Sequence, residues 1–223
     1  MELLVKMDIV YEDKDKIILN KPAGQLSQSG KSFEMDLVSE VLTYRKSKGE
    51  EAYAAIINRL DRPVSGLVLM AKNKKEAARL SLLMQKETLC KHYQVLVCGK
   101  PDSDEGDLVD NLIKDAKNNE SSVVSKGTAG SKEARLKYRL LSYDEEADIS
   151  RLDIHLITGR HHQIRVQLAS RNMPVAGDGK YGGNMAAQAA ERIKGIRIKR
   201  GCIALCAVSL KVDGKLYEVK PGF

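Results

Sequence analysis

The sequence predicts a single α+β domain built around a β-sheet. Short extended runs are interspersed with segments in which apolar residues recur at helical spacing, and this change of period predicts strands with flanking helices. The chain of 223 residues fits one large domain, and it contains neither an internal repeat nor a composition shift typical of an interdomain linker. We therefore expect one domain over residues 1–223. Because Trp is absent and Phe occurs twice, Leu, Ile, Val and Ala must fill the core.

The N-terminal half of the chain alternates extended and helical patterns. Two extended runs, residues 9–12 and 17–20, flank a polar turn and predict a hairpin. Apolar residues three or four positions apart predict helices over residues 36–48 and 74–86. Between these helices, the apolar run at residues 67–70 is bounded by Gly and Lys and predicts a buried strand.

The C-terminal half is dominated by strands. Alternating residues predict a half-buried strand over residues 91–97, and two further strands over 134–143 and 150–157 that an acidic turn joins. Residues 101–132 are polar, and we expect a long excursion with a hairpin inside it. A variable loop is favoured over an RNA-facing one here. Residues 161–171 fit both periods, and Asn and Pro after them favour a helix.

Charge and composition narrow the class of protein. The formal net charge of +7 favours an anionic partner, for which nucleic acid and an anionic membrane both qualify. The sequence has no run of about 18 apolar residues and no N-terminal leader pattern, so we expect a cytoplasmic protein without a membrane partner. Four cysteines show no CxxC pair and are expected to be reduced, mostly buried thiols: Cys90, Cys98, Cys202 and Cys206.

The most informative segment is residues 58–72, in which Asp61 lies between Arg59 and Arg62. The residue before a proline avoids the helical conformation, so Arg62 should not be helical and Asp61 should lie on a loop. The strand that follows would hold this loop against a rigid sheet. Taken alone, the segment is more readily explained as an exposed cluster of ion pairs, which contributes little to stability.

The segment resembles the aspartate motif of the RluA-type RNA pseudouridine synthases, in which His-Arg-Leu-Asp is followed by Ser-Gly and an apolar strand. Asn58 stands where the family usually has His, and Val64 where it often has Thr. Further blocks resemble the family's motifs in the family's order: residues 18–24, 91–97, 156–168, 174–182 and 203–207. In the last block Cys206 replaces a His. This ordered series is specific, unlike a single three-residue pattern.

The resemblance implies a mixed, largely antiparallel sheet with flanking helices and a central RNA-binding cleft. It implies an enzyme that isomerises uridines in structured rRNA or tRNA to pseudouridine, acts as a monomer and needs no cofactor. Because the matching blocks begin near residue 9, we expect no N-terminal RNA-binding domain of the S4 type. Target recognition would then depend on the catalytic surface.

The reaction of this family breaks the bond between uracil N1 and ribose C1′ and rejoins the base through C5. One carboxylate that acts as a nucleophile or base at the sugar suffices, and Asp61 is the candidate. A glycosidase needs two flanking carboxylates, and no second acid lies in a matching motif. By resemblance, Arg165 keeps Asp61 ionised and Tyr93 stacks on the target base. An aromatic residue in a strand more often belongs to the core, so the role of Tyr93 rests on the resemblance.

Other residues are candidates for binding RNA. Arg59 would either fill the gap that a flipped base leaves or contact a phosphate, and both alternatives remain open. Further RNA contacts are predicted for Lys21, Arg62, Arg160, His162 and Gln163. A zinc site formed by His155, His161 and His162 is not expected, because adjacent histidines diverge and no thiol completes a known spacing. The basic stretch at residues 192–200 is either a solvated face or a contact to the RNA backbone.

Two other functions compete with this one. A catalytically inactive RNA-binding protein of the same fold would explain the departures at Asn58 and Cys206, but intact Asp61, Tyr93 and Arg165 argue against it. A nucleoside or nucleotide hydrolase would need a second acid or a metal site, and the sequence offers neither in a matching motif. We therefore expect an RNA pseudouridine synthase.

Overall fold

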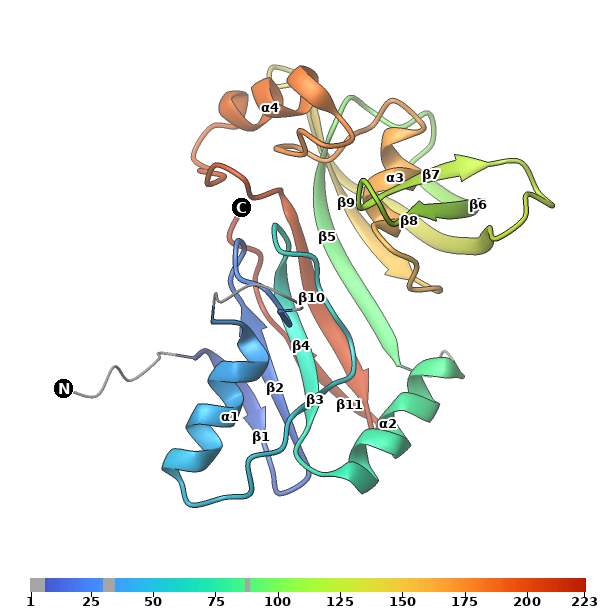
Figure 1. Cartoon of the computed structure of the whole chain (residues 1–223). Helices are drawn as coiled ribbons and strands as arrows, with labels where there is room; N and C mark the ends of the chain where they lie inside the picture. Colours follow the sequence, from blue (N-terminus) through green and yellow to red (C-terminus); the bar gives the residue numbers. More distant parts are fainter. Residues whose placement is uncertain (1–6, 30–34, 87–88) are drawn as a thin grey trace.

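The computed structural model describes residues 7–29, 35–86 and 89–223 and shows a long mixed sheet with helices packed on it (Figure 1). The described strands are β1 (Ile9–Glu12), β2 (Lys16–Lys21), β3 (Ala55–Ile56), β4 (Ser65–Ala71), β5 (Cys90–Cys98), β6 (Glu105–Asp115), β7 (Glu120–Val124), β8 (Lys132–Asp144), β9 (Ile149–Leu156), β10 (Leu205–Val212) and β11 (Lys215–Glu218). The described helices are α1 (Leu37–Ser47), α2 (Lys74–Gln85), α3 (Gln163–Ala169) and α4 (Gly183–Arg192).

The strands form one sheet in the order β1-β2-β4-β10-β5-β9-β8-β6-β7, with β3 paired to β4 and β11 to β10. Every pairing of the named strands is antiparallel except that of β4 with β10. In Figure 1, β5 lies between two halves of this sheet: one contains β1–β4, α1 and α2, and the other contains β6–β9 and α3. The predicted mixed, largely antiparallel sheet is confirmed.

The first two helices begin where the sequence provides a capping side chain. Asp36 accepts a hydrogen bond from the backbone N–H of Ser39, and Asn73 accepts one from that of Glu76. Such caps satisfy N–H groups that lack a partner in the first helical turn. The observed bounds of α1 and α2 therefore agree with the predictions to within one residue at each end.

The parallel pairing of β4 with β10 depends on Gly66. Gly66 lies opposite Ala207, and a Cβ at Gly66 would come within 2.3 Å of the Ala207 carbonyl oxygen. The φ of Gly66 is +112°, a conformation that L side chains rarely adopt. This close approach fixes the start of β4 against β10, and β4 follows directly on the loop that carries Asp61.

The structure confirms the hairpin expected within residues 101–132. Most of this region is the β6–β7 hairpin and the start of β8, and the polar sequence reflects a ribbon with many exposed side chains. The turn end of the hairpin reaches the central cleft described below. The elements that the sequence did not predict are α4 and the short strands β3 and β11.

Candidate active site

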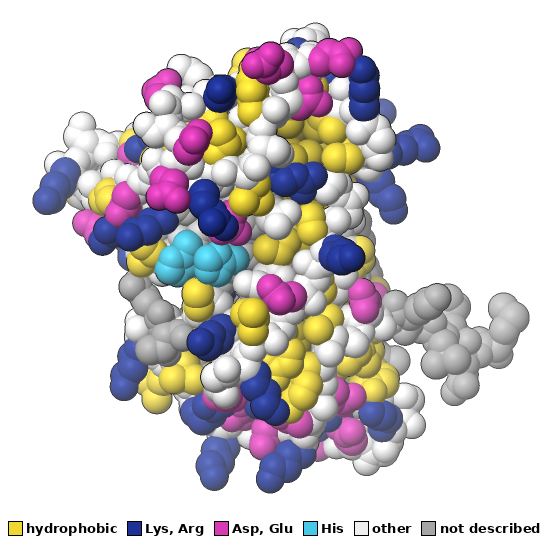
Figure 2. Space-filling model, turned by 180° about the vertical axis from the view of Figure 1, so that it is seen from behind, with side chains coloured by type: hydrophobic (Ala, Val, Ile, Leu, Met, Phe, Trp, Pro, Cys, Tyr) yellow, Lys and Arg dark blue, Asp and Glu magenta, His cyan; other side chains and the backbone are white. Residues whose placement is uncertain are grey.

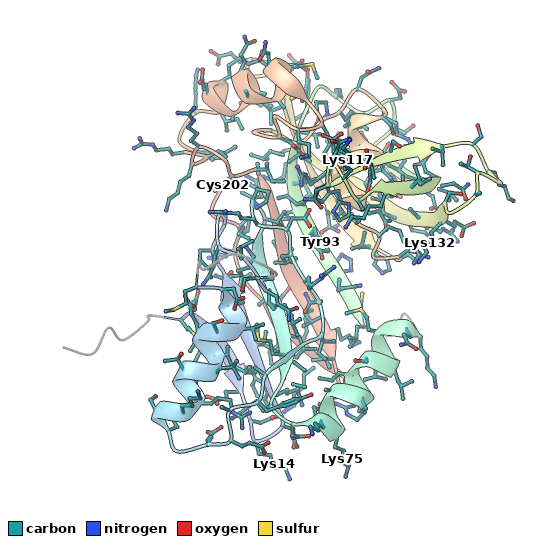
Figure 3. All side chains as sticks on the ribbon, viewed as in Figure 1. Lys14, Lys75, Tyr93, Lys117, Lys132 and Cys202 are labelled. Carbon is teal, nitrogen blue, oxygen red and sulfur yellow. The ribbon has the colours of Figure 1, made fainter. Side chains whose placement is uncertain are left out.

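A cleft of about 830 Å³ lies where the loop before β4, the middle of β5 and the start of α3 meet. Figure 3 shows Tyr93 at this central position, between the two halves of the sheet. Among the described residues that line the cleft, seven are basic and one is acidic. The acid is Asp61, and the basic residues are Arg59, Arg62, Lys91, Lys114, Arg160, Arg165 and Lys180. A cleft with this excess of positive charge attracts a polyanion.

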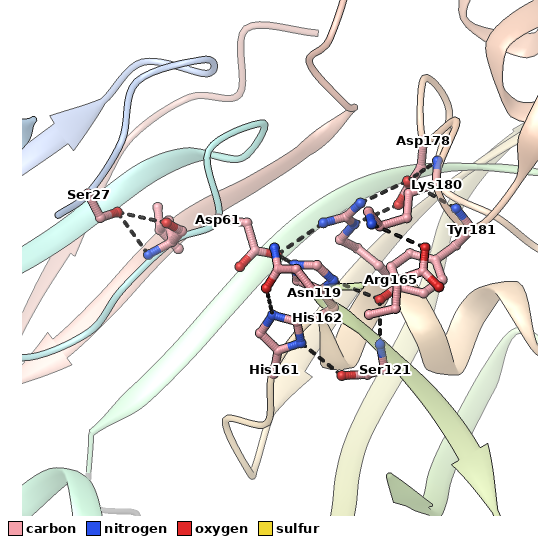
Figure 4. A network of polar contacts seen from close by, with 12 residues as sticks. Ser27, Asp61, Asn119, Ser121, His161, His162, Arg165, Asp178, Lys180 and Tyr181 are labelled. Carbon is pink, nitrogen blue, oxygen red and sulfur yellow. Dashed lines mark hydrogen bonds and ion pairs between the residues drawn. The ribbon is translucent and has the colours of Figure 1, made fainter. Parts of the chain in front are cut away.

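Asp61 lies on a loop, as predicted, and its side chain is 31% exposed. Its Oδ2 lies 3.3 Å from Nη1 of Arg165 and 3.5 Å from Nε2 of His162 (Figure 4). The structure therefore joins Asp61 to Arg165 across 104 positions of sequence, which is the pairing that the resemblance implies. The carboxylate keeps enough exposure to meet a ligand in the cleft.

The guanidinium of Arg165 is held in place by Asp178. Its Nε donates to Asp178 at 2.6 Å and its Nη2 at 2.9 Å, and both side chains are almost completely buried. Burial alone would lower the pKa of Arg165, but the hydrogen bonds and charge of Asp178, with a contribution from Asp61, raise it above its ordinary value. Arg165 is thus a fixed positive charge beside Asp61.

His162 is the second side chain that contacts Asp61. It precedes α3 with a φ of 52°, and its Nδ1 lies 2.7 Å from the hydroxyl of Tyr181. Burial lowers the pKa of His162 to about 4, although Asp61 acts in the opposite direction. A neutral His162 satisfies both contacts when the Tyr181 hydroxyl donates to Nδ1 and Nε2–H points to Asp61. The same hydroxyl accepts the backbone N–H of Ser121 at 2.9 Å.

The β6–β7 hairpin reaches the site through its turn. Ser121 Oγ lies 2.8 Å from Nδ1 of His161, and Asn119 Oδ1 lies 3.1 Å from Nε2 of the same ring (Figure 4). His161 in turn stacks on His162, with ring centroids 3.7 Å apart. These contacts connect the turn to the residues around Asp61, and nothing in the polar sequence of the hairpin indicates them.

Tyr93 projects from β5 into the cleft, and its side chain is mostly buried. Burial is the main cause that raises the pKa of its phenol above the ordinary value, and the nearby Asp61 acts in the same direction. The phenol therefore stays neutral, and its ring, 6% exposed, forms an aromatic surface in the wall of the cleft. Stacking on an extruded base requires such a surface.

Asn58, which replaces the family's usual His, has a structural role. Its side-chain amide donates to the carbonyl of Leu67 at 3.0 Å and accepts the N–H of Leu69 at 2.8 Å. The buried amide of Asn58 thus links the loop that carries Asp61 to the backbone of β4. The departure from the family pattern leaves Asp61 and Arg165 in contact.

The predicted RNA-binding residues fall into two groups. Arg59, Arg62 and Arg160 are exposed and line the cleft, and His162 lies in its wall. Arg62 donates to the carbonyl of Gly24 and Arg160 to that of Glu133, so both side chains are oriented by the backbone.

Lys21 and Gln163, which were also predicted to contact RNA, are buried, unlike the three arginines. Lys21 is fully buried, donates to the carbonyls of Pro22 and Gln25, and has a pKa that burial lowers to about 8. Gln163 is also buried, and it contacts Thr158, the backbone of Arg160 and other protein groups. Both side chains brace the loops beside the cleft. Lys21 does not line the cleft, whereas Gln163 does, so a direct contact of Gln163 with RNA stays a prediction.

Several residues of the site were not predicted, among them Asp178 and Tyr181. Asp178 and Tyr181 lie in the block 174–182, which the sequence comparison had matched but to which no role was given. The block itself could have indicated a role for these two residues, since it combines an acid and an aromatic residue with several glycines. The predicted thiols are confirmed as unpaired, with Cys90 half-buried and Cys98, Cys202 and Cys206 buried.

Solved structures identify the fold. The chain superposes on human RNA Pseudouridylate Synthase Domain Containing 4 with a TM-score of 0.76 at 19% identity, covering 96% of this chain and 88% of that one. For human RNA Pseudouridylate Synthase Domain Containing 1 the TM-score is 0.73 at 20% identity, covering 98% and 84%. The protein therefore has the pseudouridylate synthase fold, as predicted.

The family follows from the sequence match. The model described as RNA pseudouridylate synthase matches residues 15–170, and the chain belongs to this family. Its relatives include an uncharacterized RNA pseudouridine synthase of Bacillus subtilis, 30% identical over 80% of this chain and 58% of the relative. Ribosomal large subunit pseudouridine synthase D of Nitrosomonas europaea is 34% identical over 80% of this chain and 50% of the relative. The chain thus spans between half and three-fifths of the length of these two relatives.

Proposed function

We propose that this protein isomerises specific uridines in structured RNA to pseudouridine, with Asp61 as the catalytic carboxylate. The observation that carries the proposal is the position of Asp61 as the one acid among seven basic residues in the described lining of the cleft. Membership of the pseudouridylate synthase family supports the type of reaction. The basic lining supports RNA rather than a free nucleoside as the substrate.

In the proposed reaction the carboxylate of Asp61 acts at the ribose, either as a nucleophile on C1′ or as a base that removes a sugar proton. The bond between N1 and C1′ breaks, the uracil turns, and a new bond forms between C5 and C1′. The proton on C5 is released and N1 gains a proton, so the product is an isomer of the substrate. One carboxylate is sufficient for these steps.

The neighbours of Asp61 have distinct proposed roles. Arg165, fixed by Asp178, orients the carboxylate. Neutral His162 supplies a second hydrogen-bond donor to the carboxylate of Asp61. Tyr93 offers a stacking surface for the extruded uracil. Arg59 and Arg160 are placed on the exposed rim of the cleft, where phosphates of the RNA would lie.

We further propose ribosomal RNA as the substrate. Two relatives are named ribosomal large subunit pseudouridine synthases C and D, at 32% and 34% identity to this chain. The substrate assay below includes tRNA, because the family resemblance implies either rRNA or tRNA as the substrate. The expectations of a cytoplasmic monomer that needs no cofactor are kept as part of the proposal, and no described helix is long and apolar enough to span a membrane.

The assay uses RNA labelled with tritium at C5 of uridine, because isomerisation releases that label to water. Wild-type protein is incubated with transcripts of large-subunit rRNA and of tRNA. We expect release from rRNA, and a decrease of about 10²- to 10⁴-fold in its rate for Asp61→Asn. Asp102→Asn is the matched control, since Asp102 is exposed and does not line the cleft.

The outcomes separate the alternatives. Failure to release tritium from any transcript, with RNA binding retained, would favour an inactive RNA-binding protein. Appearance of free uracil or a free nucleobase product would favour a hydrolase. Undiminished release by Asp61→Asn would remove Asp61 from the proposed chemistry while leaving the synthase activity in place. Release from tRNA alone would reject the proposed rRNA substrate.

A further inference from the structure

A second cluster of reactive side chains lies on β5 and β9, apart from Asp61. His92 of β5 and His155 of β9 are directly opposite in the strand register, and their rings stack with centroids 4.9 Å apart and planes 5° apart. Alternate residues of a strand point to opposite faces, so His92 projects away from the face on which its neighbour Tyr93 enters the cleft. Figure 2 shows histidine side chains gathered in one patch on the rear face of the molecule.

Cys90 completes the cluster two positions before His92. Its Sγ lies 3.6 Å from Nε2 of His155, and the ligand atoms of Cys90, His92 and His155 all lie within 4.8 Å of one another. In a tetrahedral zinc site with a Zn–S distance of about 2.3 Å and a Zn–N distance of about 2.0–2.1 Å, the sulfur and nitrogen are about 3.6 Å apart. The Cys90–His155 separation therefore already equals one edge of such a site.

Asp153 supplies the outer partner that metal-binding histidines usually have. Its Oδ2 lies 3.3 Å from Nδ1 of His92, so the carboxylate can accept the Nδ1–H and leave Nε2 of that ring as the ligand atom. A carboxylate in this place fixes the tautomer and raises the basicity of the imidazole.

We propose that Cys90, His92 and His155 bind a zinc-class divalent ion, with water in the fourth position. The set of one thiolate and two imidazoles suits Zn²⁺ and disfavours Mg²⁺ and Ca²⁺, which take oxygen ligands. All three side chains are half-buried, so an ion can enter from solvent. Lys137, opposite His155 in the register of β8 and β9, adds a positive charge that lowers the affinity.

An ion bound at this site would stabilise the sheet and would take no part in the proposed reaction. It joins β5 to β9 immediately behind Tyr93, which lies opposite Ile154 on the other face of the same two strands. An ion that binds the folded chain stabilises it in proportion to its occupancy. The ion would therefore strengthen the strand pair that carries Tyr93, and it has no place in the chemistry at Asp61.

The test uses Co²⁺ as a spectroscopic probe for the Zn²⁺ site, added to the reduced full-length chain. We expect one equivalent to bind and to give a thiolate-to-cobalt charge-transfer band, which an equivalent of Zn²⁺ abolishes. Cys90→Ser and His155→Ala should lose this band. Cys202→Ser is the matched control, because Cys202 is buried and lies outside the cluster. Asp153→Asn should weaken binding by about 10- to 100-fold.

A measurement on the unaltered chain covers the case in which a variant fails to fold. Zn²⁺ should slow alkylation of Cys90, located by peptide mass, and should leave alkylation of Cys98, Cys202 and Cys206 unchanged. The proposal is overturned if the wild-type protein binds no stoichiometric Co²⁺, or if the charge-transfer band survives in Cys90→Ser. Equal alkylation of Cys90 with and without Zn²⁺ would overturn it as well, and would identify Cys90 as a thiol that only contacts His155.

Discussion

Asp178 holds Arg165 by a two-point hydrogen-bonded pair, at 2.6 Å and 2.9 Å, and thereby leaves Nη1 of the guanidinium to reach Asp61. Asp61, the proposed catalytic acid, is thus oriented through a second acid that does not line the cleft. Because Asp178 is 1% exposed, its charge is not screened by water. Asp178 is therefore a positioning residue for the site.

Replacement of Asp178 by Asn should lower kcat and leave the KM for RNA nearly unchanged. The amide provides one acceptor in place of two and removes the charge that holds the guanidinium, so Arg165 orients Asp61 less well. Removing one partner of a buried ion pair costs about 3–5 kcal/mol of stability, and thermal unfolding should show the loss. The kinetics are measured well below the unfolding temperature, with Asp102→Asn as control. A variant that is less stable but has wild-type kcat would reduce Asp178 to a purely structural role.

Gly66 should be the most sensitive glycine around the Asp61 loop. In Gly66→Ala the new Cβ would collide with the backbone of Ala207 and would also sit at a φ of +112°. We expect a loss of about 3 kcal/mol or more in the free energy of unfolding. Gly99→Ala is the matched control, because Gly99 has a φ of +77° with nothing within 4 Å of the new Cβ. Its cost should be about 1–2 kcal/mol, and equal losses in urea unfolding would show that the close approach to Ala207 is unimportant.

The stability of the protein should fall as the pH decreases from the ordinary pKa of histidine, 6.5, toward the value of about 4 that burial gives His162. In this window the unfolded chain binds a proton at His162 and the folded chain does not, so protons favour unfolding. His162→Gln should make this part of the pH dependence shallower. Urea unfolding across the window measures it, and the other histidines contribute equally to both curves. An unchanged slope would mean that His162 titrates at its ordinary pKa in the folded state.

The sequence predicted the parts of the fold in which local signals agree. Helices α1 and α2 have capping residues and an apolar stripe, so both their presence and their bounds were confirmed. Helix α4 was missed because its buried positions are Ala186 and Ala189, which do not stand out as an apolar stripe. It also begins at Gly182 and Gly183 without a side-chain cap.

The site was predictable only where the resemblance covered it. Asp61 and Arg165 are 104 positions apart, and no periodicity could have placed them together. The contacts of Asn119 and Ser121 with the site depend on how the β6–β7 hairpin folds back, which its polar sequence does not indicate. Lys21 was predicted to contact RNA, but the structure buries it fully and directs its ammonium to backbone carbonyls.

Two roles remain open for Arg59: filling the gap left by an extruded base, or contacting a phosphate. A variant of this residue can distinguish them. It is exposed, lines the cleft and lies two residues from Asp61, a position from which it can enter the stack of an RNA helix. If Arg59 fills the gap left by the extruded uridine, Arg59→Ala should slow the reaction on a paired target. It should then act normally on a transcript in which the same uridine is unpaired, because that base needs no replacement in the stack.

A phosphate contact at Arg59 makes a different prediction. Arg59→Ala would then weaken binding to both transcripts alike and reduce the slope of log affinity against log salt by about one. Arg160→Ala provides the comparison, since Arg160 lies on the same rim with its guanidinium tied to the carbonyl of Glu133. We expect the transcript-dependent result for Arg59 and the salt-dependent result for Arg160. If both variants give the salt-dependent result, both arginines contact the RNA backbone. Another residue of the cleft would then have to fill the gap left by the extruded base.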